Sequence, residues 1–155
     1  MSKLIEIKSL NTFYGESHIL RDIDLSVKAG EMVCVIGRNG VGKTTLLKSL
    51  IGLLKTKSGE INFLGENINR QLPHQRARKG VAYVPQGREI IPYLTVEENL
   101  MLGMESLPGW LSKNKQIDNF IYELFPILKE FLSRKGGDLS GGQQQQLSLS
   151  LIHIW

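Results

Sequence analysis

The 155-residue sequence predicts an α/β fold, on three observations. In residues 1 to about 65, short runs place a hydrophobic residue at every second position, as half-buried strands do. Within the same region, a glycine-rich loop lies between a continuous apolar run and an apolar segment that reads as a helix. From Thr95 onward, apolar residues recur every three or four positions, which predicts a change from strands to helices.

The first predicted elements are strands. "KLIEIKSL" and "IDLSV" alternate in this way, and "EMVCVIG", Glu31 to Gly37, is apolar almost throughout, as expected for a strand covered on both faces. Cys34 lies in the middle of this run, so we expect a buried core thiol. "TTLLKSLIGLL" predicts a helix, Ser58-Gly59 a turn, and "EINFLG" a further strand.

Residues 66 to 94 are expected to hold a short polar helix and then a second apolar strand, "GVAYVP". The run Arg76-Ala77-Arg78-Lys79 is the densest positive cluster in the sequence. We interpret it as a solvated helix face.

The segment from Thr95 to about residue 135 is predicted to be helical. "TVEENLMLGM" opens with Thr95 and carries Glu98 three positions later, which is the arrangement of a capping box. "IDNFIYELFPIL" predicts a second helix, and "SLPGW" a loop between the two. One stripe of the second helix holds the apolar residues Ile117, Phe120, Ile121, Leu124 and Leu128.

Composition limits the possible functions. The formal net charge of +4 permits anionic ligands but does not by itself indicate nucleic acid. Cys34 is the single cysteine, which excludes an internal disulfide. The N-terminus lacks the apolar stretch of a signal peptide, and no window is long enough for a membrane span. We therefore expect a soluble, cytoplasmic-type chain whose role at a membrane would require a partner.

The glycine-rich loop predicts a phosphate site. Gly37-Arg38-Asn39-Gly40-Val41-Gly42-Lys43-Thr44 matches GxxxxGK[ST] at each fixed position. Its glycines let backbone N–H groups point at phosphate oxygens, and the next helix directs its positive N-terminal end at the same anion. Lys43 supplies a charge to the β and γ phosphates, and the Thr44 hydroxyl can coordinate Mg²⁺. A glycine-rich turn with a chance lysine is the alternative, and the strand and helix on either side argue against it.

A second anion site is predicted at LSGGQ, Leu139 to Gln143. Ser140 is a good N-cap and Gln143 lies three residues later, as in a capping box. Gly141 and Gly142 leave backbone amides bare at the start of a helix. A glycine linker before a glutamine-rich helix would be the alternative for this motif alone. That reading fits poorly downstream of a phosphate loop with a helical insert between them.

With these motifs, residues 1 to about 148 resemble the ATP-binding subunit of ABC transporters. The resemblance rests on Tyr14, GRNGVGKTT, Gln86 after "GVAYV", and LSGGQ. Tyr14 matches the aromatic residue that stacks on adenine; a core tyrosine is the alternative. Gln86 matches the glutamine that reaches Mg²⁺ and the attacking water and moves with the transmembrane partner. The LSGGQ motif matches the segment that closes on ATP held by another subunit.

The resemblance implies ATP and Mg²⁺ as cofactors. Lys43 and Gln86 are the expected catalytic residues, and Thr44 and Gln86 the expected Mg²⁺ contacts. The full set expected to bind the nucleotide is Tyr14, Gly37, Arg38, Asn39, Gly40, Val41, Gly42, Lys43, Thr44, Thr45, Gln86, Ser140, Gly141, Gly142 and Gln143.

The resemblance also implies the fold and the partners. It predicts a P-loop NTPase (ABC ATPase) core with an N-terminal antiparallel β subdomain and a helical subdomain, incomplete at the C-terminus. The expected parts are a β-rich core at about 1–94, a helical subdomain at about 95–138 and the LSGGQ segment at 139–148. Implied partners are a second ATPase subunit packed head to tail, transmembrane permease subunits and, indirectly, a periplasmic solute-binding protein, with no nucleic acid. The implied location is cytoplasmic, on the inner face of the membrane through the permease.

A narrower resemblance concerns the transported solute. "VAYVPQGREIIPYLTVEENL" is similar to the branched-chain amino acid importer group. Within that group, GREI after the glutamine and "GGDLSGGQQQQL" look most like the urea importer ATPase. Urea or branched-chain amino acids are therefore the expected solutes.

The C-terminal end raises a separate expectation. The family carries an Asp for Mg²⁺ and a Glu that polarises water on a strand after the LSGGQ helix, whereas the last acidic residue here is Asp138. Residues 149–155, LSLIHIW, look like the in-frame translation of a transposase adapter used in DNA library preparation. We expect a truncated fragment with an artefactual tail that does not hydrolyse ATP. A genuine apolar end is the alternative.

Other functions stay open at this stage. A soluble, non-transport ABC ATPase would typically carry two cassettes or a long coiled-coil insert, and the segment between Gln86 and Leu139 leaves no room for a coiled coil. A P-loop kinase would share the phosphate loop, but LSGGQ argues against it. A non-catalytic ATP-binding fragment is the remaining alternative.

Overall fold

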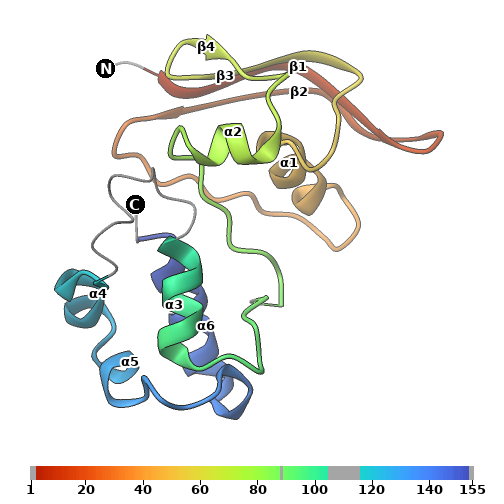
Figure 1. Ribbon diagram of the computed structural model, residues 1–155. Helices are drawn as coiled ribbons and strands as arrows, with labels where there is room; N and C mark the ends of the chain where they lie inside the picture. Colours follow the sequence, from red (N-terminus) through yellow and green to blue (C-terminus); the bar gives the residue numbers. More distant parts are fainter. Residues whose placement is uncertain (1–2, 88, 105–115, 154–155) are drawn as a thin grey trace. The chain divides into compact units, whose positions relative to one another are not determined.

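The computed structural model describes residues 3–87, 89–104 and 116–153. They divide into two compact units, Met1–Val81 and Ala82–Trp155, which are described separately below (Figure 1). Across these described ranges, none of the helices is long and apolar enough to cross a bilayer. The predicted "SLPGW" loop lies outside the described residues.

The first unit is built on a four-stranded antiparallel sheet. Its strands are β1 (Lys3–Tyr14), β2 (Ser17–Lys28), β3 (Ser58–Phe63) and β4 (Glu66–Asn67), in the order β2-β1-β3-β4. Gly15 and Glu16 connect β1 to β2, and Gly15 takes a φ of 55°, as tight hairpin turns require. The predictions of strands in "KLIEIKSL", "IDLSV" and "EINFLG" are confirmed.

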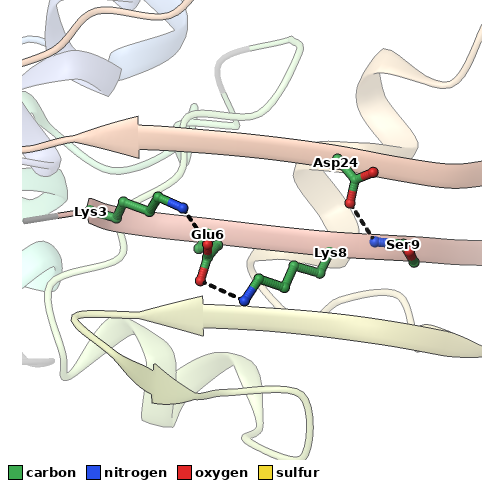
Figure 2. A network of polar contacts seen from close by, with 5 residues as sticks. All are labelled: Lys3, Glu6, Lys8, Ser9 and Asp24. Atoms are coloured by element: carbon green, nitrogen blue, oxygen red, sulfur yellow. Dashed lines mark hydrogen bonds and ion pairs between the residues drawn. The ribbon is translucent and has the colours of Figure 1, made fainter.

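A bulge interrupts β1 and is fixed by polar contacts (Figure 2). The pairing of β1 with β2 shifts between Ile7 and Leu10, and Ser9 adopts a φ of 44°. The Ser9 amide donates to the Asp24 carboxylate of β2 at 2.8 Å. This bond occupies a backbone donor that the disrupted ladder leaves without a strand partner.

The core of the first unit lies on one face of this sheet, where α1 (Lys43–Leu50) and α2 (Pro73–Ala77) are placed (Figure 1). Because side chains alternate along a strand, one set of β1, β2 and β3 residues points to the same face. Leu46 of α1 joins this set. The buried apolar residues of the cluster are Ile7, Leu10, Leu20, Leu46, Ile61, Phe63 and Ile68.

Helix α1 is shorter than the predicted segment "TTLLKSLIGLL". It ends at Leu50, with Ile51 as the C-cap. Gly52 follows with a φ of 83°, and its amide donates to the Ser49 carbonyl at 3.2 Å. A glycine in this left-handed conformation ends a helix at low cost, so the last residues of the apolar run leave the helix.

Two predicted strands are wrong. Residues 31–38 and 81–85 have no regular secondary structure. A strand requires a neighbour whose backbone accepts and donates its ladder hydrogen bonds. The sheet of the described residues contains only β1 to β4, so neither run has such a neighbour. The prediction of a buried thiol fails for the same reason, since Cys34 is exposed.

The turn predicted at Ser58-Gly59 is also wrong, because both residues begin β3 and Ser58 pairs with Asn11 of β1. Gly59 nevertheless has a structural role. A Cβ atom at this position would lie 2.4 Å from the Ser9 carbonyl oxygen and 2.6 Å from that of Lys8. The glycine thus marks a close approach of two strands.

The second unit is helical, as predicted from the change in spacing at Thr95. Its elements are α3 (Val96–Met104), α4 (Asn119–Leu124), α5 (Pro126–Glu130), the 3₁₀ turn η1 (Gly136–Asp138) and α6 (Gly141–Leu151), with α3 and α6 side by side (Figure 1). The Thr95–Glu98 capping box is confirmed by reciprocal bonds of 2.7 and 3.1 Å. The buried core residues are Val96, Leu100, Ile121, Leu128, Leu139 and Leu147.

The predicted helix "IDNFIYELFPIL" is broken in two. Pro126 disfavours the helical conformation of the preceding residue, and Phe125 has φ −130° and ψ 68°. Ile121 and Leu128 are fully buried, but Phe120 and Leu124 are 49% and 45% exposed. The prediction of a single buried stripe is therefore only partly correct.

Helix α6 continues to Leu151, so the start of the LSLIHIW tail is helical. The side chain of Leu151 packs against the core of the second unit. The adapter origin of this tail stays a prediction.

Candidate nucleotide-binding site

The phosphate loop lies at the N-terminus of α1. Gly40 and Gly42 have φ values of 84° and 103°, which favour glycine strongly. Gly42 is the N-cap of α1, and a Cβ atom there would lie 2.9 Å from Cδ2 of Leu20 on β2. The loop therefore needs glycine at Gly42 both for its backbone conformation and for its packing against the sheet.

Lys43 is held across this loop. Its Nζ donates to the carbonyl oxygens of Gly37 at 2.6 Å and Arg38 at 2.7 Å. The first turn of α1 contains no acidic residue, so the positive end of the helix dipole, about half an elementary charge, is not neutralised locally. A cationic side chain and a helix N-terminus at one exposed loop are groups that attract an anion. The binding of phosphate there stays a prediction.

Thr44 and Thr45 differ in their placement. Thr44 is exposed, whereas Thr45 is 7% exposed and packs inward. The exposed hydroxyl of Thr44 is thus free to meet a hydrated cation next to a phosphate. Its hard oxygen suits Mg²⁺, which usually takes one or two protein ligands together with phosphate oxygens and water. In the described part of the chain, no group of three or more His, Cys, Asp or Glu side chains could hold a metal by itself.

Tyr14 lies at the end of β1 and is 48% exposed. The alternative of a core tyrosine is therefore wrong. An exposed aromatic ring at the end of a strand is available to stack on a planar ligand. Its role in binding adenine stays a prediction.

The LSGGQ motif starts α6 in the second unit. Ser140 is the N-cap; its Oγ accepts from the Gln143 amide at 3.4 Å, and Gln143 Oε1 accepts from the Ser140 amide at 2.9 Å. Gly141 and Gly142 are exposed, and a Cβ atom at Gly142 would meet nothing within 4 Å. Packing therefore does not require glycine at Gly142. Because Gly142 has no side chain, a ligand can come close to the backbone amides at the helix N-terminus.

Gln86 is an exposed residue in the irregular segment that precedes α3. Gly87 follows it with a φ of 97°. The amide side chain of Gln86 offers an oxygen that can contact Mg²⁺ or water, but the residue lies outside the helices and strands of the described ranges. Its expected role stays a prediction.

Asn99 organises the stretch after Gln86 and is not among the residues predicted from the sequence. It is 2% exposed, and its Nδ2 donates to the carbonyl oxygens of Ile91, Leu94 and Thr95 at 3.0, 3.3 and 2.8 Å. Its Oδ1 accepts from the Ile91 amide at 2.9 Å. The available signal was an asparagine at a core-facing position, next to Leu100 in an otherwise apolar stripe.

The expected site residues are divided between the two units. Tyr14 and residues 37–45 belong to the first unit, and Gln86 and residues 140–143 belong to the second. The structure brings Lys43 together with Gly37 and Arg38, and Ser140 together with Gln143. The described residues of each unit thus include a helix N-terminus next to glycines. Helix α1 follows Gly42, and α6 begins with Gly141 and Gly142.

Comparison with known proteins adds a family. The model of the ABC transporter family matches residues 20–154. The chain is 40% identical over 147 residues to a probable branched-chain amino acid transport ATP-binding protein, LivF, of Archaeoglobus fulgidus, covering 95% of this chain and 61% of that protein. It is 39% identical over 150 residues to the high-affinity branched-chain amino acid transport ATP-binding protein BraG of Pseudomonas aeruginosa, covering 94% and 62%. The chain spans about three-fifths of the length of these relatives.

Solved structures agree on the fold. A nucleotide-free ATP-binding cassette from an ABC transporter has a TM-score of 0.83 and 25% identity, covering 99% of this chain and 65% of that one. An ABC transporter cassette in its ADP conformation has a TM-score of 0.82 and 26% identity, with coverage of 99% and 65%. The predicted α/β cassette fold is therefore confirmed, and the chain corresponds to part of the solved cassettes.

Proposed function

The chain belongs to the ABC transporter family, and from this premise we propose that it is the ATP-binding subunit of a solute importer. The observation that carries the proposal is the loop at the N-terminus of α1. There, Lys43 and an uncompensated helix end lie at one exposed, glycine-shaped turn. ATP, with its chain of phosphates, is the ligand that this charge arrangement favours in this family.

Nucleotide binding would begin with an exchange of partners at Lys43. The Nζ group now donates to two loop carbonyls, and phosphate oxygens would replace one or both of them. A phosphate oxygen carries a negative charge that a backbone carbonyl lacks, so the Lys43 ammonium group binds it more strongly, which favours the exchange. The backbone amides at the start of α1 would then donate to the same phosphates. Thr44 would contribute its hydroxyl to Mg²⁺, which neutralises phosphate charge when bound.

The LSGGQ segment supports a two-subunit arrangement. Its amides at Gly141 and Gly142 form a second open helix N-terminus, with the Ser140–Gln143 capping box to hold its geometry. We infer that this segment contacts the γ phosphate of an ATP held by a second, head-to-tail subunit. In the same proposal Gln86 links the nucleotide to the permease subunits. The subunit would lie in the cytoplasm, on the inner face of the membrane, and would meet the periplasmic binding protein only indirectly.

Branched-chain amino acids are the solutes that the comparisons favour. Both relatives described above are named for branched-chain amino acid transport. Urea is the second candidate, and GREI after the glutamine together with the residues before LSGGQ support it. Because the ATPase subunit does not contact the solute, its own structure does not discriminate between them.

The nucleotide assignment is tested by Lys43→Ala, with Lys48→Ala as the matched control. Both lysines belong to α1, but only Lys43 lies at the phosphate loop. We expect Lys43→Ala to weaken the binding of a fluorescent ATP analogue at least tenfold, because it removes the charge that meets the phosphates. A tenfold change in Kd corresponds to about 1.4 kcal/mol of binding free energy. Lys48→Ala should bind as the unchanged chain does. Equal affinity of all three proteins would refute the assignment.

The solute is tested through the genes next to this one. We expect two permease genes and a gene for a periplasmic binding protein. Calorimetric titration of that purified binding protein with leucine and with urea separates the two candidates. Binding of urea alone would overturn the branched-chain amino acid proposal and leave the ATPase proposal standing.

A further inference from the structure

A cavity of about 420 Å³ lies in the first unit, beyond the C-terminal end of α1. Four of its lining residues carry a positive charge: Lys55, Lys57, Arg70 and Arg76. No aspartate or glutamate lines it. We propose that this cavity binds a small, multiply charged phosphate-bearing anion, at a site separate from the phosphate loop.

Arg76 forms the fixed part of the site. The interpretation of the basic run as a solvated helix face is wrong for Arg76, which is only 3% exposed. Its guanidinium donates to the backbone carbonyls of Ser49, Leu50, Gln71 and Asn69 at 2.9, 2.6, 3.1 and 3.2 Å. Gly52 allows this approach, since a Cβ atom there would lie 3.0 Å from Nε of Arg76.

The charge of Arg76 is neutralised only in part. Its hydrogen-bond partners are carbonyl dipoles, and two of them are at the C-terminal end of α1, which carries about half a negative charge. The nearest carboxylate in this hydrogen-bond network is Glu66, which accepts from Gln71 and forms an ion pair with Lys79. Burial lowers the pKa of Arg76, which is the usual effect of removing a cation from water.

The other cations of the cavity are available to a ligand. Lys55, Lys57 and Arg70 are exposed, and none of them forms an ion pair among the residues that the structure describes. Thr56 also lines the cavity, and its Oγ1 accepts from Asn69 Nδ2 at 3.3 Å. Its hydroxyl proton can therefore donate to a ligand oxygen.

The class of ligand follows from size and charge. Small-molecule sites usually enclose roughly 300 to 1,000 Å³, and this cavity lies in that range. Lysine acts as a point charge toward phosphate, and the exposed Arg70 can bind two of its oxygens at once. Arg76 contributes mainly its charge, because four of its five N–H groups already donate to carbonyls. Several cations around one concavity favour an anion with more than one negative charge over a single carboxylate. Pyrophosphate is the simplest probe with these properties.

The site is distinct from the nucleotide site. The phosphate loop precedes α1 and the cavity follows it, and eight helical residues span about 12 Å. No residue from 37 to 44 lines the cavity. Pyrophosphate can bind at both places, so the test must first remove the phosphate loop as a competitor.

The experiment is a calorimetric titration with pyrophosphate at fixed ionic strength, on the Lys43→Ala chain. We expect one remaining binding site, and we expect a further Lys57→Gln/Arg70→Gln change to weaken it at least tenfold. The matched control is Arg21→Gln/Lys28→Gln, which removes the same charge from exposed positions of β2. The control should keep the affinity of the Lys43→Ala chain within twofold.

Two results would overturn the proposal. One is loss of all pyrophosphate binding in Lys43→Ala alone. That result would exclude the second site and would still agree with the proposal that the phosphate loop binds ATP. The other is an equal loss in the Lys57/Arg70 variant and its control, which would indicate a general charge effect. To exclude misfolding, the Lys57→Gln/Arg70→Gln change is also made with Lys43 present. That protein should bind the fluorescent ATP analogue normally.

Discussion

Strand β1 and the run from Met32 to Ile36 are both apolar segments of the first unit, but only β1 became a strand. Leu10 of β1 is fully buried, whereas Met32 and Ile36 are 96% and 88% exposed. Strand β1 has partners on both sides, one of them reached through the two residues Gly15 and Glu16. An apolar pattern therefore defines a strand only where a neighbouring backbone completes its ladder.

The two segments differ in whether the residues that complete a strand are near to it or far from it in the sequence. A hairpin needs only its own turn and the alternation of its two arms, which are both present in the sequence of β1 and β2. A strand buried on both faces needs parallel neighbours, which are supplied by residues far away in the chain. The runs 32–36 and 81–85 lack such a neighbour within the described ranges, so their apolar composition alone misled the prediction.

The largest predicted effect tests this difference directly. Leu10→Ala should lower the free energy of unfolding by about 2 to 5 kcal/mol, because it removes buried methyl groups and leaves a cavity. Ile36→Ala should change it by no more than about 0.5 kcal/mol, as expected for an exposed position. Urea denaturation followed by circular dichroism gives both values. A cost at Ile36 as large as that at Leu10 would show that the run is buried in solution.

The second prediction applies the same contrast to the basic run of α2. Arg76→Met should lower the free energy of unfolding by about 1 to 3 kcal/mol, since buried carbonyls lose their donors. Arg78→Met removes the same charge from an exposed residue two positions later and should be nearly neutral. Thermal unfolding of the two variants measures the difference. Similar values for both would mean that Arg76 contributes no more than a surface charge.

The parts of the molecule that could be predicted are those fixed by neighbours in sequence. The Thr95–Glu98 and Ser140–Gln143 capping boxes each involve residues three positions apart, and both formed as expected. The left-handed glycines of the phosphate loop also follow from a contiguous motif. Pro126 also indicates the helix break at Phe125, whereas the prediction of a single helix rested on the apolar stripe alone.

The parts that could not be predicted depend on distant contacts. Arg76 bonds to Ser49 and Leu50, some 26 positions away, and nothing within its own run marks that partnership. In the sequence alone Gly59 resembles a turn residue, because the close contact that requires glycine is with Lys8 and Ser9 of another strand. The candidate site shows the same division. Its two glycine-rich motifs were identified from sequence, whereas the Asn99 anchor emerged only with the positions of Ile91 and Leu94.

The smallest predicted effect concerns polar surface residues of β1 itself. Glu6 forms ion pairs with Lys3 and Lys8, the latter with Nζ 3.2 Å from Oε2 (Figure 2). Hydrogen bonding from Lys3, and then from Lys8, lowers the pKa of the Glu6 carboxyl below its ordinary value of 4.5. Exposed pairs of this kind contribute little to stability because water and salt screen them.

The direction of the pH effect is nevertheless defined. Because the pKa of Glu6 is lower in the folded chain than in the unfolded one, its stabilisation is present above the unfolded value. It is lost as the pH falls through the lower, folded value. Glu6→Gln should therefore reduce the melting temperature slightly at pH 7 and by less at pH 2. The control Glu16→Gln, in the exposed β1–β2 turn, should show no such pH-dependent difference, since Glu16 has no ion pair among the described residues.

Raising the salt concentration to 1 M at pH 7 should remove the difference between Glu6→Gln and the unchanged chain. A larger effect of Glu6→Gln at pH 2 than at pH 7 would contradict this prediction, because protonation of the carboxyl as the pH falls can only weaken its ion pairs with Lys3 and Lys8.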